Sequence, residues 1–190
     1  MNIVPILETE RLVLRPLELA DAPAIQREFP HWEIVRLLNP VIPWPYPDDG
    51  AEIYVRDIAL PAVARGEAWH WSLRPKIDPG QLIGVISLID DEEENRGFWI
   101  ARDWQCQGLM TEASIAVTNF WFDVLGKTVL RAPKAVENEA SRRISLRTGM
   151  TLLKTTQKQL MCGEMPAEIW EVSAAEWRAR AAYTRPAAIL

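Results

Sequence analysis

The sequence has 190 residues, of which 48% are hydrophobic and 25% are charged. This is the composition of a globular chain that is long enough to bury one sizeable core. Its formal net charge of -5 argues against broad neutralisation of nucleic-acid phosphates and mildly favours a cationic partner.

The two cysteines, Cys106 and Cys162, cannot build a disulfide framework, and with only His31 and His70 the chain has no zinc-ligand spacing. The first residues do not combine a basic segment with an apolar one, and no apolar run approaches the ~20 residues of a membrane span. We therefore expect a cytoplasmic protein with no metal, no nucleic-acid partner and no membrane partner.

Hydrophobic periodicity and turn residues predict the elements of the first half in chain order. An alternating strand covers 11–15 and ends at Pro16, and two short helices cover 21–29 and 31–38. A proline-rich loop follows, because proline fixes φ and donates no backbone hydrogen bond. The next helix is capped by Asp48 or Asp49 and should kink or end near Leu60, because Pro61 interrupts its pattern.

The second half alternates between strands and helices. Strands are predicted over 68–73, 82–89, 97–101, 128–132, 151–160 and 168–172. The helix over 109–125 has the clearest apolar stripe, with Glu112, Thr118, Asn119 and Asp123 on its opposite side. A last helix covers 139–148 and stops at Gly149. This order predicts one α/β domain over residues 1–183, with a mixed, mostly antiparallel sheet, helices on both faces and a disordered tail over 184–190.

One segment indicates a ligand. A strand at 97–101 leads into a short loop, and Gly108 in that loop opens the long helix. The first amides of a helix have no intrahelical acceptor and carry partial positive charge, so they suit a diphosphate. Glycine lets the ligand approach without a Cβ in the way. A lone glycine is equally compatible with a tight turn that binds nothing.

The surrounding residues resemble a family. The run Gln105-x-x-Gly108-x-Met110 resembles the Q/R-x-x-G-x-G/A signature of the Gcn5-related N-acetyltransferases (GNAT). The longer text WQCQGLMTEA is similar to the branch that acetylates protein N-termini, which includes the RimJ/RimL-type enzymes. The opening ETERLVLRPLELADA, the run from Asn138 to Met150, and the segments at 169–172 and 176–177 also resemble that family, so the likeness covers nearly the whole chain.

This resemblance implies acetyl-CoA as co-substrate. The strand before the loop would pair with the pantetheine arm, the loop would bind the diphosphate, and Asn138 and Ser141 would lie along the arm near the thioester. The implied cofactor-binding residues are Trp99, Ile100, Ala101, Gln105, Cys106, Gln107, Gly108, Leu109, Met110, Thr111, Asn138 and Ser141. Met110 departs from the small residue of the signature, so its side chain needs space of its own. Asn138 is equally suited to be a helix N-cap.

Proton transfer is where the chain departs from the family. Ser145 stands where many members have a tyrosine that protonates the leaving thiolate, and Asn95 stands where many have a glutamate base. The candidate catalytic residues are therefore Ser141, Ser145 and Glu94, although the acidic run that holds Glu94 also suits a solvated turn.

The acceptor is expected to be the α-amine of a protein or peptide N-terminus, or in second place a small molecule such as an antibiotic or polyamine. Trp44 and Tyr46 lie where the family closes a loop over the acceptor, so we predict that they bind it. A non-catalytic acyl-CoA-binding module and a structural dimerisation domain are the alternatives, because fold alone does not decide function. A homodimer stays open.

Overall fold

The structure is a computed structural model that describes residues 4–180. The predicted tail at 184–190 and the end of the predicted domain lie outside the described residues. The strands are β1 (Leu7–Glu8), β2 (Leu12–Pro16), β3 (Ala68–Pro75), β4 (Gly84–Ile89), β5 (Arg96–Ile100), β6 (Val129–Ala135), β7 (Thr151–Leu160) and β8 (Gly163–Ser173). The helices are α1 (Ala22–Glu28), α2 (Trp32–Val35), α3 (Gly50–Ile53), α4 (Leu60–Arg65), α5 (Leu109–Asn119), α6 (Glu139–Arg147) and α7 (Ala174–Arg178).

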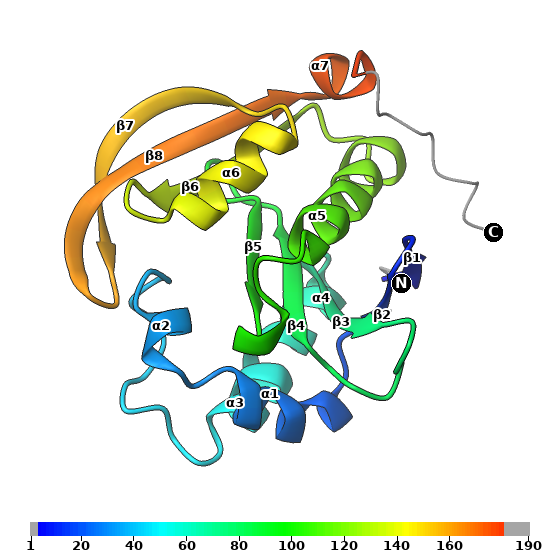
Figure 1. Cartoon of the computed structure of the whole chain (residues 1–190), viewed down its shortest axis with the longest axis vertical. Coiled ribbons are helices and arrows are strands. Elements are labelled where there is room, and N and C mark those ends of the chain that lie inside the picture. Colours follow the sequence, from blue (N-terminus) through cyan, green and yellow to red (C-terminus); the bar gives the residue numbers. More distant parts are fainter. Residues whose placement is uncertain (1–3, 181–190) are drawn as a thin grey trace.

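The strands form two sheets. Five strands pair antiparallel in the order β1-β2-β3-β4-β5, and three more pair antiparallel in the order β6-β8-β7. The long hairpin of β7 and β8 arches away from β5, as Figure 1 shows. The predicted fold class, a single mixed α/β domain with largely antiparallel sheets and helices on both faces, is confirmed.

Helices cover both faces of the larger sheet, and each face has its own core. On one face, Trp69, Trp71 and Leu73 of β3 pack in a cluster with Met110 and Val117 of α5. On the other face lies a second cluster, made of residues from α1, α2, α3 and the π-helical segment that follows α3. Every residue of β3 is therefore buried, as expected for a strand covered on both sides.

Two helices differ in detail from the sequence-based expectations. The helix that begins at Gly50 was expected to kink or end near Leu60; it does not end there, because a π-helical segment (Tyr54–Ala59) continues it into α4, and the change of helix type falls at Leu60. Pro61 is tolerated there because it falls in the first turn of α4, where an amide would lack an intrahelical acceptor. Thr118 is not on a solvent face either: it is fully buried, and its hydroxyl donates to the Ser114 carbonyl at 2.7 Å.

The two sheets meet through Asn95, the residue that precedes β5. Its backbone N–H donates to the Arg131 carbonyl at 2.8 Å, and its side-chain Oδ1 accepts from the Arg131 N–H at 2.7 Å. Its Nδ2 donates to the carbonyls of Asp91 and Ile89, which close the β4–β5 turn. Only 4% of Asn95 is exposed. One buried amide therefore joins the sheets where β5 begins.

We predict that Asn95→Ala lowers the free energy of unfolding by about 1–3 kcal/mol, because it removes the hydrogen bonds of a buried amide and leaves the Arg131 N–H without its acceptor. Urea unfolding followed by circular dichroism measures this loss. Gln157→Ala, at an exposed position of β7, is the control and should stay within about 0.5 kcal/mol of the unchanged protein. Equal stability of the two variants would contradict a structural role for the Asn95 amide.

Candidate functional site

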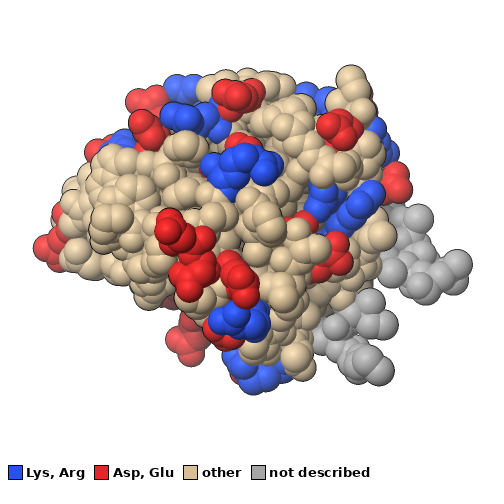
Figure 2. Space-filling view, turned by 90° about the horizontal axis from the view of Figure 1, so that it is seen from below, with Lys and Arg blue, Asp and Glu red and all other residues tan. Residues whose placement is uncertain are grey.

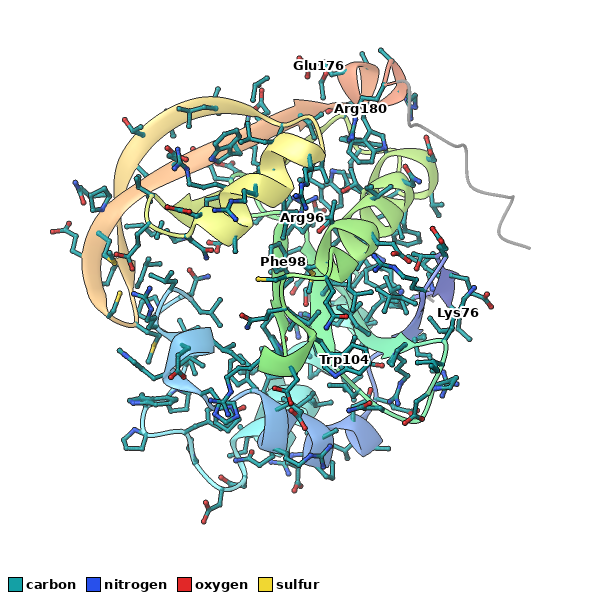
Figure 3. The ribbon with its side chains drawn as sticks, viewed as in Figure 1. Lys76, Arg96, Phe98, Trp104, Glu176 and Arg180 are labelled. Atoms are coloured by element: carbon teal, nitrogen blue, oxygen red, sulfur yellow. The ribbon has the colours of Figure 1, made fainter. Side chains whose placement is uncertain are left out.

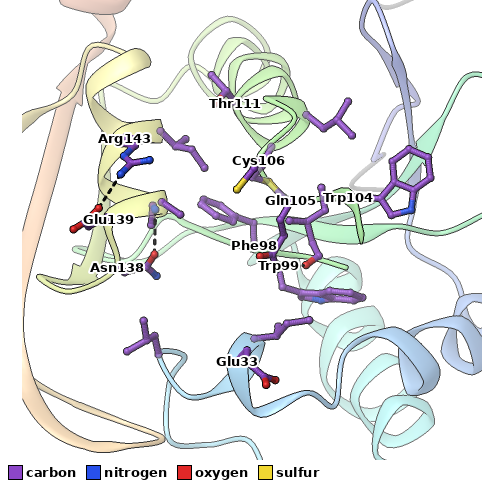
Figure 4. A pocket seen from close by; sticks show the side chains of 18 of the residues that line it. Glu33, Phe98, Trp99, Trp104, Gln105, Cys106, Thr111, Asn138, Glu139 and Arg143 are labelled. Carbon is purple, nitrogen blue, oxygen red and sulfur yellow. Dashed lines mark hydrogen bonds and ion pairs between the residues drawn. The ribbon is translucent and has the colours of Figure 1, made fainter. Parts of the chain in front are cut away.

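A pocket of about 520 Å³ opens where the two sheets diverge. Its walls come from four places: the end of β5, the loop that opens α5, the first turns of α6, and α2 (Figure 4). Both β5 and β6 lead into helices whose N-termini line this pocket, so the two strands run toward it in the same direction. Its lining residues are Glu33, Ile34, Arg36, Leu37, Leu38, Phe98, Trp99, Ile100, Trp104, Gln105, Cys106, Gln107, Gly108, Leu109, Met110, Thr111, Glu137, Asn138, Glu139, Ala140, Ser141, Arg143, Ile144 and Arg147.

The N-terminus of α5 supplies backbone donors. The first intrahelical bond runs from the Glu112 amide to the Gly108 carbonyl at 3.1 Å, so the amides of Leu109, Met110 and Thr111 come before it. Gly108 has φ +79°, a left-handed conformation that glycine adopts without strain. The end of α5 can thus present several N–H groups to an anion, with the helix dipole adding to the attraction.

An ion pair from the first sheet holds this loop. The Glu112 carboxylate accepts from the Arg11 backbone N–H at 2.7 Å and from Arg11 Nε at 2.8 Å, and it also accepts from the Thr9 hydroxyl. Arg11 Nη1 donates to the Gln107 carbonyl at 2.9 Å. We call this arrangement the Arg11–Glu112 brace. It connects the chain before β2 to α5 and to the loop that precedes it.

The brace affects the protonation of Glu112. Burial alone would raise the pKa of this carboxyl, but the hydrogen bonds from Thr9 and Arg11, together with the charge of Arg11, outweigh burial and lower the pKa. Glu112 is therefore ionised over the whole range in which the protein is expected to work.

The end of β5 has one free edge. Phe98, Trp99 and Ile100 pair with β4 on one side, and in the described part of the chain β5 has no strand partner on the other. The side-chain Nε2 of Gln105 donates to the Ile100 carbonyl at 3.2 Å and fastens the loop to the end of the strand. The edge facing the pocket can therefore pair with amide groups of a ligand, as an added strand would.

The first turn of α6 faces this edge across the pocket. Asn138 is the N-cap of α6, and its Oδ1 accepts from the Ser141 amide at 3.1 Å. Its side-chain NH₂ group retains its donors for a ligand. Arg143 and Arg147, one turn apart on α6, also line the pocket, and Arg143 is paired with Glu139 at 2.8 Å.

The β7–β8 turn holds the α2 side of the pocket in place. The Met161 amide donates to the Leu38 carbonyl, and the Cys162 amide donates to the Arg36 carbonyl, each at 3.0 Å. Arg36 also pairs with Glu137, just before α6, at 2.5 Å. Three segments far apart in sequence thus surround one opening.

Some of the residues predicted from sequence lie outside this pocket. Ala101 is buried, and its amide donates to the Ile83 carbonyl at 2.8 Å. Ser145 is fully buried, and its Oγ lies 2.6 Å from Lys134 Nζ. Glu94 lies beside a second, smaller cavity of about 290 Å³, where it accepts from Asn39 at 2.8 Å and from Lys158 at 2.7 Å.

The two predicted acceptor-binding aromatics are also outside the pocket lining. Trp44 is exposed and packs against Trp32, with ring centroids 5.3 Å apart. Tyr46 packs against Phe29, which in turn contacts the pocket residue Trp99 at 5.2 Å. Tyr46 therefore reaches the pocket only through Phe29, and the roles of both residues stay predictions.

Met110, which departs from the family signature, and Cys106, at a position that the signature leaves open, both line the pocket. Met110 is part of the pocket lining, and only 5% of the residue is exposed because it packs in the core cluster beneath α5. This is the space that its size required. Cys106 is exposed and is the one described non-glycine residue with a positive φ, at +60°.

Sequence reasoning missed the Arg11–Glu112 brace, the α2 wall and the two arginines of α6. The Arg11–Glu112 brace and the α2 wall depend on contacts between segments far apart in the chain, so no local sequence pattern predicts them. The spacing of Arg143 and Arg147 did carry a signal, because residues four apart share one face of a helix. Two arginines on the face after Ser141 are suited to an anionic ligand.

The face of the molecule in Figure 2 carries both positive and negative side chains. Figure 2 shows acidic and basic side chains interspersed there, with no continuous basic stripe of the kind that follows a nucleic-acid backbone. Within residues 4–180, no helix combines the length and apolarity needed to cross a membrane.

Two comparisons of the sequence with known proteins found similar proteins. Residues 11–151 match the model of the acetyltransferase (GNAT) domain family. The sequence is 34% identical over 74 residues to "Putative ribosomal N-acetyltransferase YdaF" of Bacillus subtilis (strain 168). That match spans 37% of this chain and 40% of the relative, so it covers well under two thirds of that protein's length.

Solved structures are similar over most of the chain. RimL, a ribosomal L7/L12 α-N-protein acetyltransferase in complex with coenzyme A, has a TM-score of 0.75 at 19% identity, over 90% of this chain and 97% of its own. Ribosomal-protein-S5-alanine acetyltransferase from Vibrio fischeri has a TM-score of 0.77 at 14% identity, over 91% and 98%. Mycobacterium smegmatis RimJ has 0.79 at 16% identity, over 92% and 90%. At these identities the likeness shows a shared fold.

We predict that Glu112→Gln lowers the free energy of unfolding at pH 7 by about 1–3 kcal/mol, because the brace loses its charge-assisted hydrogen bonds. The folded-state pKa of Glu112 is depressed, so the contribution is full above the ordinary value of 4.5 and is lost as the pH falls through the folded pKa. The difference between the two proteins should therefore shrink as the pH falls below 4.5. Denaturant unfolding at several pH values measures it.

Glu52→Gln, which removes an exposed i,i+4 pair with Arg56, is the matched control and should change stability by no more than about 0.5 kcal/mol. A Glu112→Gln difference that is equally small, or independent of pH, would contradict the brace.

Proposed function

Because the chain belongs to the acetyltransferase (GNAT) domain family, we propose that it transfers the acetyl group of acetyl-CoA to the N-terminal α-amine of a protein or peptide. The observation that carries this proposal is the convergence of three features on one pocket: the α5 N-terminus, the free edge of β5 and the capped start of α6. Together they match the diphosphate, the amides and the thioester end of that co-substrate.

The cofactor would be held mainly by backbone groups. The amides from Gly108 to Thr111 would bind the diphosphate, since anions are stabilised at a helix N-terminus. The exposed edge at Trp99 and Ile100 would pair with the pantetheine amides. The NH₂ group of Asn138 would donate to the same arm. Arg143 and Arg147 add positive charge at the pocket wall, which favours a ligand that carries several phosphates.

The chemistry that suits this site is direct attack of a neutral amine on the thioester carbon. Holding amine and thioester together supplies a large share of the rate, and backbone donors stabilise the developing oxyanion. Of the predicted proton-handling groups, Ser141 lines the pocket, and we propose it as the hydroxyl nearest the thioester. Ser145 and Glu94 stay predictions, and each would act only through intervening groups, given their contacts with Lys134 and Lys158.

The choice of a peptide acceptor is supported by what the similar proteins are named for, since RimL and the Vibrio fischeri enzyme are described as ribosomal-protein acetyltransferases. The pocket wall formed by α2 and the residues after it combines apolar side chains (Ile34, Leu37 and Leu38) with the charged Glu33 and Arg36, so it offers contacts both to the side chains and to the α-amine of a peptide. Cys106 and Cys162 are free and exposed, as expected in a reducing cytoplasm, where we propose that the protein acts.

We predict that acetyl-CoA raises the melting temperature of the protein and that Gly108→Asp abolishes the shift, because a carboxylate would then face the diphosphate. A ligand that binds only the folded state contributes about 2.7 kcal/mol at 100 times its Kd. Gly126→Asp is the matched control: its φ is +67°, so the backbone strain is similar, and a Cβ there meets no atom within 4 Å. Retention of the full shift in Gly108→Asp would remove the loop from the binding site.

An acceptor screen tests the transfer itself. Acetyl-CoA is incubated with peptides that have a free α-amine, with the same peptides blocked at that amine, and with polyamines and aminoglycosides, while released thiol is measured. We expect thiol release and one added acetyl group with free α-amines alone. Reaction with the small amines would change the acceptor class, and binding of acetyl-CoA without thiol release for any amine would favour a non-catalytic module.

A further inference from the structure

Two cations lie buried between the two sheets and the helices that cover them. Arg96 is the first residue of β5 and 5% exposed, and Lys134 is on β6 and 7% exposed. Lys134 Nζ donates to the Ala132 carbonyl at 3.1 Å and lies 2.6 Å from the Ser145 hydroxyl. Arg96 donates to the Thr118 hydroxyl at 3.1 Å. We call Arg96 and Lys134 the buried cation pair.

The surroundings do not neutralise this pair. The nearby carboxylate is Glu168 of β8, which is bonded to Arg142 at 2.8 and 3.1 Å and accepts from the Trp170 indole at 2.9 Å. Arg96 is bonded to a hydroxyl and to the Met150 sulfur rather than to a carboxylate, and its Nε has no hydrogen-bond partner. A buried charge is costly unless it is paired, so this excess of positive charge calls for a function.

The buried cation pair lies behind residues that line the pocket. Side chains two apart on a strand share a face, so Arg96 and the pocket residue Phe98 point the same way, into the space between α5 and α6 (Figure 3). Ser145, which contacts Lys134, is one helical turn beyond the pocket residue Ser141 on the same face of α6. Positive charge is therefore placed beside the part of the pocket lined by Phe98 and Ser141, near the start of β5, where the sheets begin to diverge.

We propose that Arg96 and Lys134 set a positive electrostatic potential at this end of the pocket and thereby stabilise the thiolate that leaves when the acetyl group is transferred. The inference rests on the proposed function. The amine nitrogen bonds to the carbonyl carbon, the carbon–sulfur bond breaks with its electron pair going to sulfur, and the nitrogen releases its proton to water. The two cations touch no reacting atom, so they act through the field at the sulfur.

The net charge of the buried cation pair depends on pH. Burial lowers the pKa of Lys134, and repulsion from Arg96 lowers it further, against the attraction of Glu168, to about 7. The other groups at the amine, the Ser145 hydroxyl of α6, the Ala132 carbonyl of β6 and the Trp170 ring of β8, are uncharged. Burial also lowers the pKa of Arg96, to about 10, which leaves it charged at neutral pH. As the pH rises through about 7, Lys134 therefore loses its charge and Arg96 keeps its own.

The first test needs no variant. Ultraviolet titration of the thiol of CoA bound to the protein should give a pKa about one unit or more below that of free CoA, since a nearby positive charge favours the anion. If the pKa of the bound thiol equals or exceeds that of free CoA, the inference is overturned. Failure of CoA to bind would overturn the proposed function and this inference with it, so the two failures are distinguishable.

The second test uses Lys134→Met, which keeps the length of the side chain and removes the charge. We expect the pKa of the bound thiol to rise toward that of free CoA and kcat below pH 7 to fall about 10-fold, with the KM for acetyl-CoA unchanged. The acceptor amine also titrates, so kcat is divided by the fraction of acceptor that is neutral at each pH. This corrected kcat should decline in the unchanged protein as the pH rises through about 7, and the decline should be absent in the variant. A merely structural lysine would not change the shape of the pH profile.

Lys127→Met is the control, because Lys127 pairs with Asp90 on the surface and is not part of the pocket lining. It should leave both the thiol pKa and the pH profile as they are. Lys134→Met with an unaltered thiol pKa and an unaltered pH profile would contradict the inference. Should this variant fail to fold, the thiol pKa in the unchanged protein decides.

Discussion

The two sheets are joined through Asn95, and the site depends on where that joint lies. The backbone and side chain of Asn95 both bond to Arg131, so the sheets are held together at the start of β5 and are free to separate beyond it. The separation exposes one edge of β5 and makes room between α5 and α6 for the pocket. An amide serves this purpose better than a carboxylate, because the position requires both a donor and an acceptor in a buried place. Asn95, which the resemblance to the family places where a glutamate base was expected, is thus a structural element in this fold.

The second requirement is a rigid loop at the start of α5. Backbone amides bind an anion well only if they are already oriented, because ordering them on binding would cost conformational entropy. The Arg11–Glu112 brace meets this need by tying the loop carbonyl of Gln107 and the first turn of α5 to the beginning of the first sheet. On the opposite side, the N-cap Asn138 orders the first turn of α6. The two helix N-termini that line the pocket are therefore each held by side chains that sequence reasoning regards as ordinary surface or capping residues.

The buried cation pair is unusual in a core that otherwise obeys the normal rules of burial. Most of the chain's ion pairs are partly exposed and contribute little to stability. Arg96 and Lys134 are different, since both are nearly inaccessible, Arg96 is bonded to no carboxylate, and the Glu168 carboxylate that attracts Lys134 is itself bonded to Arg142. Perturbed charges of this kind gather at functional sites more often than elsewhere in a fold. Their place beneath the pocket links this unfavourable feature of the core to the chemistry that the pocket supports.

Local patterns in the sequence determined much of the fold and the two helix N-termini that line the pocket. The strand–glycine–helix junction at Gly108, the N-cap at Asn138 and the strands β3 and β4 are all visible in short stretches, because helix capping and strand periodicity depend on residues that are close in sequence. The tertiary structure alone decided which polar side chains reach the pocket. Glu94 bonds to Asn39 and Lys158, which are 55 and 64 residues away, and Ser145 bonds to Lys134 across the gap between a helix and a sheet. Those partners are chosen by the register of β7 and by the placement of α2 and α6, which depend on the packing of the whole chain and not on any local spacing.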